Sequence, residues 1–145
     1  MTVNEKQARL TEALLPLRDT NQRLAWLVEQ ARQRPPMPAE VRIDANRVEG
    51  CLARLWFTAE LREGRCNFQS DSDSLVVKSV AGLLCEFYSG LTPDKILQHD
   101  PAFLAGLGIN QHLTRNRRNA LSSVWERIRS FAEGQGTDQT RPALS

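Results

Sequence analysis

The sequence predicts an α+β domain, in which a small three-stranded antiparallel sheet carries helices packed mainly on one face. Residues 55–62 alternate between apolar and polar side chains, as in a strand with one buried face. Glu63 and Gly64 follow as a two-residue turn, so residues 65–70 are expected to fold back beside the first strand. A short extended run that begins near residue 46 and leads into the loop at Cys51 is expected to add the third strand, so that the sheet covers about residues 46–70. Apolar residues at helical spacing mark the segments before and after this sheet.

Two helices are predicted before the sheet. They are expected over residues 4–17 and 20–34, because aliphatic side chains recur there every three or four positions. A proline-rich stretch follows the second helix, and proline lacks the amide donor that a helix needs. Residues 34–46 are therefore expected to form an extended connector that leads into the sheet.

The helices after the sheet are predicted from their start signals. Residues 71–74 read Asp-Ser-Asp-Ser, which suits the positive end of a helix, and the helix itself is expected over residues 74–88. A Thr-Pro pair and an Asp-Pro pair then introduce two short helices, over residues 93–98 and 102–107. Together these helices are expected to cover the apolar face of the sheet.

A last helix is predicted from about Thr114, because apolar residues recur along it at helical spacing. Its stripe consists of Leu121, Val124, Trp125, Ile128 and Phe131. Residues 134–145 are rich in Gly, Thr and Gln, and a fraying tail is expected there. The predicted organisation is one domain over residues 1–133 followed by a flexible C-terminal tail over 134–145.

Composition and charge exclude several classes of function. The 145 residues carry 19 basic and 17 acidic side chains, a near balance that argues against nucleic acid as a partner. No apolar run approaches the roughly 20 residues that span a bilayer, so no membrane association is expected. Residues 1–6 lack the basic and then apolar layout of a secretion signal. The expected location is the cytoplasm.

The three cysteines are expected to be free thiols with different roles. In the predicted hairpin register Cys66 lies opposite Leu61 on the core face, and Cys85 lies within an apolar helix, so both are interpreted as structural. No two cysteines form a close pair, and close pairs are typical of metal and Fe–S sites. Cys51 directly follows Gly50, whose backbone freedom suits a turn. It is either a small buried residue or an accessible nucleophile.

Several short motifs resemble the SufE family of sulfur acceptors, in the family's order and over roughly residues 20–132. They are Val48-x-Gly50-Cys51 followed by Leu55-Trp56, then Asp71-Ser72-Asp73-Ser74, and finally His112-Leu113-Thr114-x-x-Arg117. The resemblance implies the fold that this family shares with the IscU scaffold proteins. It also implies that Cys51 accepts sulfur as a persulfide from a PLP-dependent cysteine desulfurase of the SufS or CsdA kind, and passes it toward an Fe–S scaffold. PLP would belong to the partner, so no intrinsic cofactor and no metal are expected.

The same resemblance assigns partner binding to Gly50, Trp56, Asp73 and Arg117, and each of the last three has a structural alternative. Trp56 points away from the core face, so it either covers a second layer of helices or stays partly exposed as a contact. Asp73 is equally suited to capping a helix, and Arg117 to a solvated helix face.

Three other functions stay open at this stage. The shared fold leaves a scaffold that assembles an Fe–S cluster on itself, and the sulfur destination leaves a thiolation pathway outside cluster assembly. A basic nucleic-acid-binding module using the arginines at the start of the last helix is disfavoured by the balanced charge.

Overall fold

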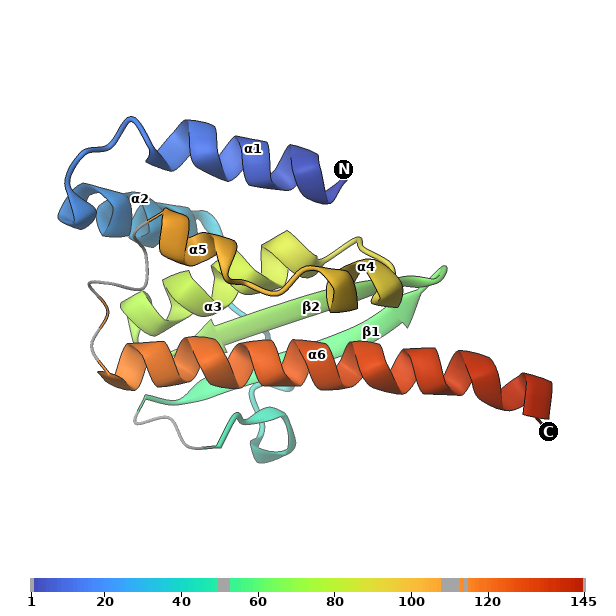
Figure 1. Cartoon of the computed structure of the whole chain (residues 1–145). Helices are drawn as coiled ribbons and strands as arrows, with labels where there is room; N and C mark the ends of the chain where they lie inside the picture. The colour runs from blue at the N-terminus through green and yellow to red at the C-terminus, as the bar shows by residue number, and fades with distance from the viewer. Residues whose placement is uncertain (1, 50–52, 108–112, 114, 145) are drawn as a thin grey trace.

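An antiparallel hairpin of β1 (Leu55–Arg62) and β2 (Arg65–Ser72) lies at the centre of the chain. The computed structural model describes residues 2–49, 53–107, 113 and 115–144. Helices α3 (Leu75–Tyr88) and α6 (Arg115–Leu144) pack on one face of the hairpin (Figure 1). The α+β class is thereby confirmed.

The predicted hairpin register is confirmed. Leu61 pairs with Cys66, and Ala59 pairs with Phe68. Glu63 and Gly64 both have positive φ, at 53° and 77°, as expected for a two-residue turn that matches the twist of the strands. Glycine adopts this conformation without steric cost, which explains its place at the second turn position. The strand β2 runs to Ser72, two residues further than predicted.

The prediction of a third strand is wrong for the described residues, where the sheet has two strands. The segment before residue 50 contributes a single antiparallel bridge between Arg47 and Trp56, supported by a hydrogen bond from Val48 N to Leu55 O at 2.8 Å. A 3₁₀ turn, η1 (Asp44–Asn46), ends directly before this bridge. Because the 3₁₀ turn ends only at Asn46, too few of the described residues run alongside β1 to form a strand.

The remaining helices begin and end close to the predicted positions. They are α1 (Val3–Leu14), α2 (Thr20–Gln33), α4 (Pro93–Gln98) and α5 (Phe103–Gly106). Asp19 caps α2 by accepting a hydrogen bond from Asn21 N at 3.0 Å, and Ser74 caps α3 by accepting one from Val77 N at 3.3 Å. Helix α6 continues to Leu144, so this element does not end at residue 133. The flexible tail over residues 134–145 and the division of the chain at residue 133 stay predictions.

The core lies between the hairpin and helices α3 and α6. Phe68 stacks on Phe57 and meets the ring edge of Phe131 from α6, each at a centroid distance of 5.8 Å. The predicted stripe of α6 faces this core, where Val124 and Ile128 are buried. Burial of such a continuous apolar surface is the main contribution to the stability of the domain.

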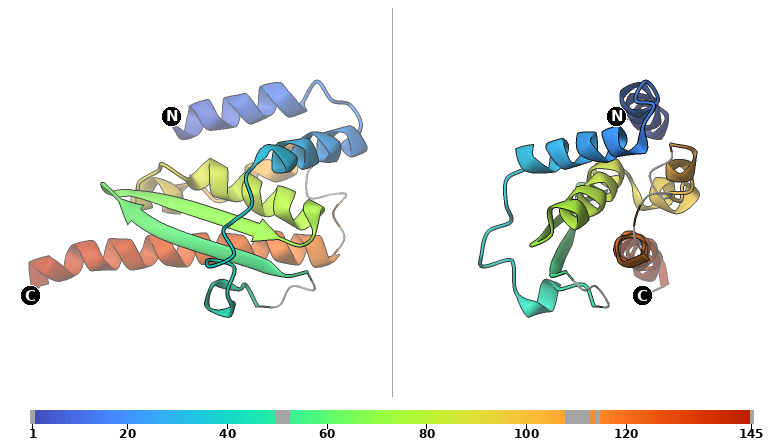
Figure 2. Two further views of the ribbon diagram at one scale, coloured as in Figure 1. Left: turned by 180° about the vertical axis from the view of Figure 1, so that it is seen from behind. Right: turned by 90° about the vertical axis from the view of Figure 1, so that its left-hand side faces the viewer.

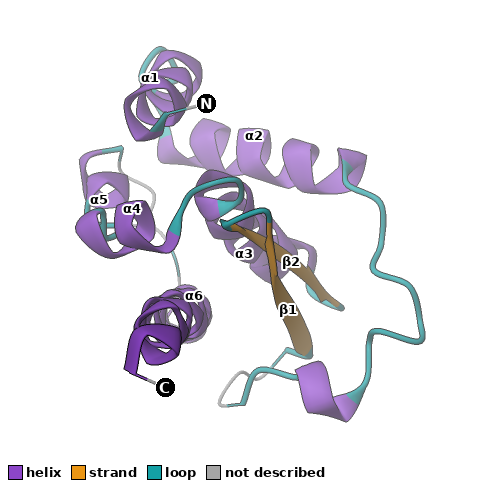
Figure 3. Cartoon of the chain, turned by 90° about the vertical axis from the view of Figure 1, so that its right-hand side faces the viewer, coloured by secondary structure: helices purple, strands orange, loops and turns teal. Residues whose placement is uncertain are grey.

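The connector between α2 and β1 covers the second face of the hairpin (Figures 2 and 3). The buried Asp71 carboxylate accepts a hydrogen bond from Met37 N at 2.9 Å, which attaches the connector to β2. The Arg42 guanidinium lies 5.7 Å from the centroid of the Trp56 ring. Helices therefore cover one face, as predicted, while a single extended segment shields the other. No helix in the described part of the chain is long and apolar enough to cross a membrane.

Candidate functional site

The candidate site lies at one end of the molecule, where β1, α3 and α6 all begin (Figures 1 and 2). The predicted nucleophile Cys51 and its neighbour Gly50 lie outside the described residues. The described chain stops at Glu49 and resumes at Ala53. The site is therefore described by the two segments that flank residues 50–52.

The segment before residue 50 is fastened to both β1 and α6. Arg47 O accepts a hydrogen bond from the Arg127 guanidinium at 3.0 Å, and Arg47 also forms the bridge to Trp56. Next to it, Val48 is buried and donates its backbone amide to Leu55 O. We call this set of contacts the upstream clamp. A guanidinium donor strengthens it, because hydrogen bonds from a charged group are stronger than neutral ones.

The segment after residue 52 is fastened to the turn between β2 and α3. Asp73 Oδ1 accepts from Arg54 N at 3.0 Å, and Asp73 N donates to Arg54 O at 3.3 Å. Ser72 Oγ also donates to Arg54 O, at 2.5 Å. We call these contacts the downstream clamp. Asp73 does not cap α3, since Ser74 does so, and the helix-capping alternative for Asp73 is therefore wrong.

The other predicted partner-binding residues fall on the same end of the molecule. Trp56 is only 9% exposed, and the Arg42 guanidinium of the connector lies over its ring. It is therefore covered by the connector, and not by the second layer of helices that was one predicted alternative; its role in partner binding stays a prediction. Arg117 is half-buried near the start of α6. Arg127 was missed as a site residue, because its position on a basic stretch of helix resembles that of any solvated arginine. Only the tertiary structure shows its contact with a segment 80 residues away.

Basic and apolar side chains are exposed on the segments that begin at this end of the molecule and on the connector. Arg115 and Arg118 are exposed in the first turn of α6, and Arg54 is exposed before β1, against the acidic Glu49 and Asp73. Two aliphatic side chains are also exposed, Leu75 at the start of α3 (36%) and Ile43 before η1 (48%). This mixture of cationic and apolar groups is suited to a protein partner with acidic groups around an apolar contact.

The other two cysteines are buried and unreactive. Cys66 is 0% exposed and Cys85 is 3% exposed, which confirms their predicted place in the core. Burial raises the pKa of the Cys66 thiol to about 11 and that of Cys85 to about 12. Since the thiolate is the nucleophile and metal ligand, neither side chain is available for sulfur chemistry at neutral pH. Among the described residues, no group of three or more His, Cys, Asp or Glu side chains is placed to hold a metal ion.

Comparison with known proteins decides the family. Residues 8–132 match the SufE family, which is described as an Fe-S metabolism associated domain. The chain belongs to the SufE family. The match extends the predicted resemblance toward the N-terminus, so that it includes part of α1.

Related sequences and a solved structure agree with SufE membership. An uncharacterised SufE-like protein of Synechocystis is 30% identical over 131 residues, covering 90% of this chain and 82% of the relative. An uncharacterised SufE-like protein of Rhizobium meliloti is 29% identical over 118 residues, covering 78% of this chain and 84% of the relative. The solution structure of a hypothetical protein from Thermus thermophilus matches with a TM-score of 0.73 at 26% identity, over 91% of this chain and 96% of that one.

Proposed function

We propose that this SufE protein accepts sulfur on Cys51 from the persulfide of a PLP-dependent cysteine desulfurase, stimulates that enzyme, and passes the sulfur on for Fe–S cluster assembly. Family membership gives the association with Fe–S metabolism. The observation that carries the finer proposal is the state of the other thiols. Of three cysteines in the chain, Cys66 and Cys85 are buried with raised pKa values, which leaves Cys51 as the candidate acceptor.

The chemistry requires one thiolate and no redox partner. The Cys51 thiolate attacks the outer sulfur of the persulfide on the partner, and the S–S bond of that persulfide breaks. The partner's inner sulfur leaves as a thiolate, and the outer sulfur with its proton is now bound to Cys51 as a persulfide. The desulfurase regains its free cysteine and can turn over again, which accounts for stimulation. PLP is the cofactor of the desulfurase, and that enzyme releases the sulfur from free cysteine.

The clamps give this reaction a structural setting. They fix the chain on either side of residues 50–52: Arg47 is attached to β1 and α6, and Arg54 is attached to the turn between β2 and α3. The basic side chains of this end would meet acidic groups of the desulfurase, and Leu75 and Ile43 would contribute apolar contact area. Cys66 and Cys85 are free thiols, which is consistent with a reaction in the cytoplasm, where thiols stay reduced.

The test follows the sulfur atom to a named residue. The protein is incubated with PLP-loaded SufS- or CsdA-like desulfurase and cysteine, and mass spectrometry of its peptides locates added sulfur. Sulfur is expected on Cys51, and the desulfurase is expected to turn over faster. Cys51→Ser should abolish both effects, whereas Cys66→Ser should preserve them. Equal sulfur uptake by wild type and Cys51→Ser would contradict the proposal.

A second stage tests where the sulfur goes. Persulfidated protein is separated from the desulfurase and mixed with an Fe–S scaffold and iron, and cluster formation is followed by absorbance. Transfer to the scaffold supports a role in cluster assembly. Failure of this step, with sulfur retained on Cys51, would restrict the proposal to acceptance and would favour a thiolation pathway as the destination.

A further inference from the structure

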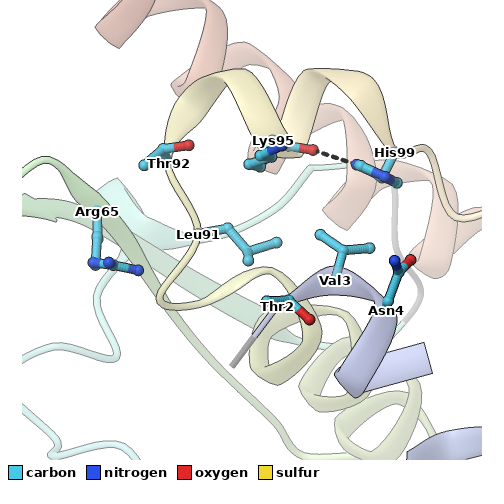
Figure 4. A pocket seen from close by; sticks show the side chains of 8 residues that line it. All are labelled: Thr2, Val3, Asn4, Arg65, Leu91, Thr92, Lys95 and His99. Carbon is cyan, nitrogen blue, oxygen red and sulfur yellow. Dashed lines mark hydrogen bonds between the residues drawn. The ribbon is translucent and has the colours of Figure 1, made fainter. Parts of the chain in front are cut away.

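A pocket of about 480 Å³ lies between the start of β2, helix α4 and the start of α1 (Figure 4). These elements lie away from the end of the molecule where β1, α3 and α6 begin (Figure 1). Its floor is apolar and is made by the buried side chains of Val3 and Leu91. Its rim is basic and is made by Arg65, Lys95 and His99. Neither family membership nor sulfur transfer accounts for this pocket.

The basic side chains that line the pocket come from two parts of the fold. Arg65 is the first residue of β2, Lys95 lies in α4, and His99 follows α4 (Figure 4). Among the described residues, no acidic side chain lines the pocket. Glu5 and Asp94 belong to the neighbouring helices but are not among the lining residues. The two cations Arg65 and Lys95, without a lining carboxylate, give the pocket a positive potential.

Two of these side chains are held in place by the backbone. Arg65 Nη1 donates to Gly90 O at 2.9 Å, and His99 Nδ1 lies 2.9 Å from Lys95 O. Each contact uses one nitrogen and leaves the others of the same group for a ligand: Nη2 and Nε of Arg65, and Nε2 of His99. Side chains that are already oriented lose less conformational freedom when a ligand binds.

We propose that this pocket binds a small molecule that carries an oxyanion, a phosphate or a carboxylate, on an apolar body. The oxyanion would accept hydrogen bonds from Arg65 and Lys95, and the apolar part would rest on Val3 and Leu91. The hydroxyl of Thr92, which also lines the pocket, adds a further donor. The pocket is a binding site separate from the thiol chemistry, and it does not depend on the proposed function.

The test uses phenyl phosphate, phenylacetate and the neutral benzyl alcohol as probes. Each is titrated into the isotope-labelled full-length protein, and NMR follows the signals of Val3, Leu91 and Thr92. We expect the anions to shift these signals with saturation, and benzyl alcohol to bind at least about tenfold more weakly because it lacks the charge. The tighter of the two anions identifies the head group. Binding of the anions should weaken as salt is added.

A variant of Lys95 tests whether the basic rim of the pocket binds the anion. Lys95→Gln should weaken phenyl phosphate binding about fivefold, because it removes one charged donor while preserving most of the length of the side chain. Arg62→Gln is the control, since Arg62 is an exposed cation on the hairpin that carries Arg65 but does not line the pocket. Cys51→Ser should bind like wild type, so failure of sulfur transfer would not affect this result. Equal affinity of Lys95→Gln and wild type, or equal binding of benzyl alcohol, would overturn the proposal.

Discussion

The Arg127 guanidinium donates a hydrogen bond at 3.0 Å to the backbone carbonyl of Arg47, and thereby joins the last helix to the segment that leads into the proposed acceptor cysteine. Arg127 lies on α6, which also packs against α3 and β1. Arg47 is bridged to Trp56 of β1. The upstream clamp therefore fixes the approach to residue 50 from two directions, and its strength can be tested separately from the sulfur chemistry.

Arg127→Gln should change the reactivity of Cys51 more than the stability of the fold. The substitution removes a charged donor to one carbonyl, which contributes on the order of 1 kcal/mol. We expect the rate of iodoacetamide labelling at Cys51, and of sulfur uptake from a desulfurase, to change several-fold. Peptide mass spectrometry measures both rates. Arg127→Lys should restore part of the wild-type behaviour, because the ammonium keeps the charge and a donor.

Arg129→Gln is the control for Arg127. Arg129 lies on the same helix, but its ion pairs are with Glu126 and Glu133 of that helix. Such exposed pairs contribute little, so labelling of Cys51 should stay at the wild-type rate. If Arg127→Gln and Arg129→Gln behave alike, the upstream clamp has no influence on Cys51.

Asp73 should affect stability and Cys51 reactivity through the hydrogen bond that its carboxylate accepts from Arg54 N. Asp73→Asn retains an amide oxygen that can accept from Arg54 N, whereas Asp73→Ala leaves that amide without its partner. We expect Asp73→Ala to lower the free energy of unfolding by about 1 kcal/mol and to alter Cys51 labelling, with a smaller change for Asp73→Asn. Urea unfolding and labelling kinetics measure the two effects. A larger effect of the asparagine would mean that the charge of Asp73, and not this hydrogen bond, is what matters.

The sequence predicted those features that depend on local pattern. Alternation indicated β1, the Glu63–Gly64 turn determined the hairpin register, and that register correctly placed Cys66 in the core. What failed depends on contacts between distant segments. The η1 turn leaves only a single bridge where a third strand was predicted. Asp73 accepts a hydrogen bond from Arg54 N, 19 residues earlier in the chain, and does not cap the helix that follows it.

Prediction of the candidate site has the same limit, because local motifs indicate the family but contacts between distant segments leave no local pattern. Motif order indicated the family, and the family match confirms it. No local pattern distinguishes Arg127 from the other arginines of α6, because what sets it apart is a carbonyl from another part of the fold. The alternation of β1 placed Trp56 on the second face but did not show that the connector covers it.

Asp71 should be the most sensitive polar residue for stability. Its buried carboxylate accepts from Met37 N and Ser72 N, and Lys78 Nζ lies 3.7 Å away. Asp71→Ala removes these acceptors and leaves the Met37 amide buried, so the free energy of unfolding should fall by about 2–3 kcal/mol. Urea unfolding measures the loss. The exposed Asp94→Ala is the control, and an equally small effect of both would mean that the connector is not held through Asp71.

The buried thiols should make the protein lose stability in alkaline solution. The pKa of Cys66 rises from its ordinary value of 9.0 to about 11 in the folded protein, and that of Cys85 to about 12, because burial disfavours the thiolate. The unfolded chain therefore releases these protons first as the pH rises. Their contribution is complete below pH 9.0 and is lost progressively as the pH rises through about 11 and 12.

Cys85→Ala tests this linkage, because alanine packs in the core without a titrating group. The variant should be less stable than wild type at neutral pH through the lost sulfur atom, and this difference should shrink as the pH rises above 9.0. Thermal unfolding from about pH 7 to about pH 11 in the presence of a reducing agent measures the difference. A difference that stays constant over this range would show that the Cys85 thiol ionises as readily in the folded protein as in the unfolded chain, which its burial among α3 core residues should prevent.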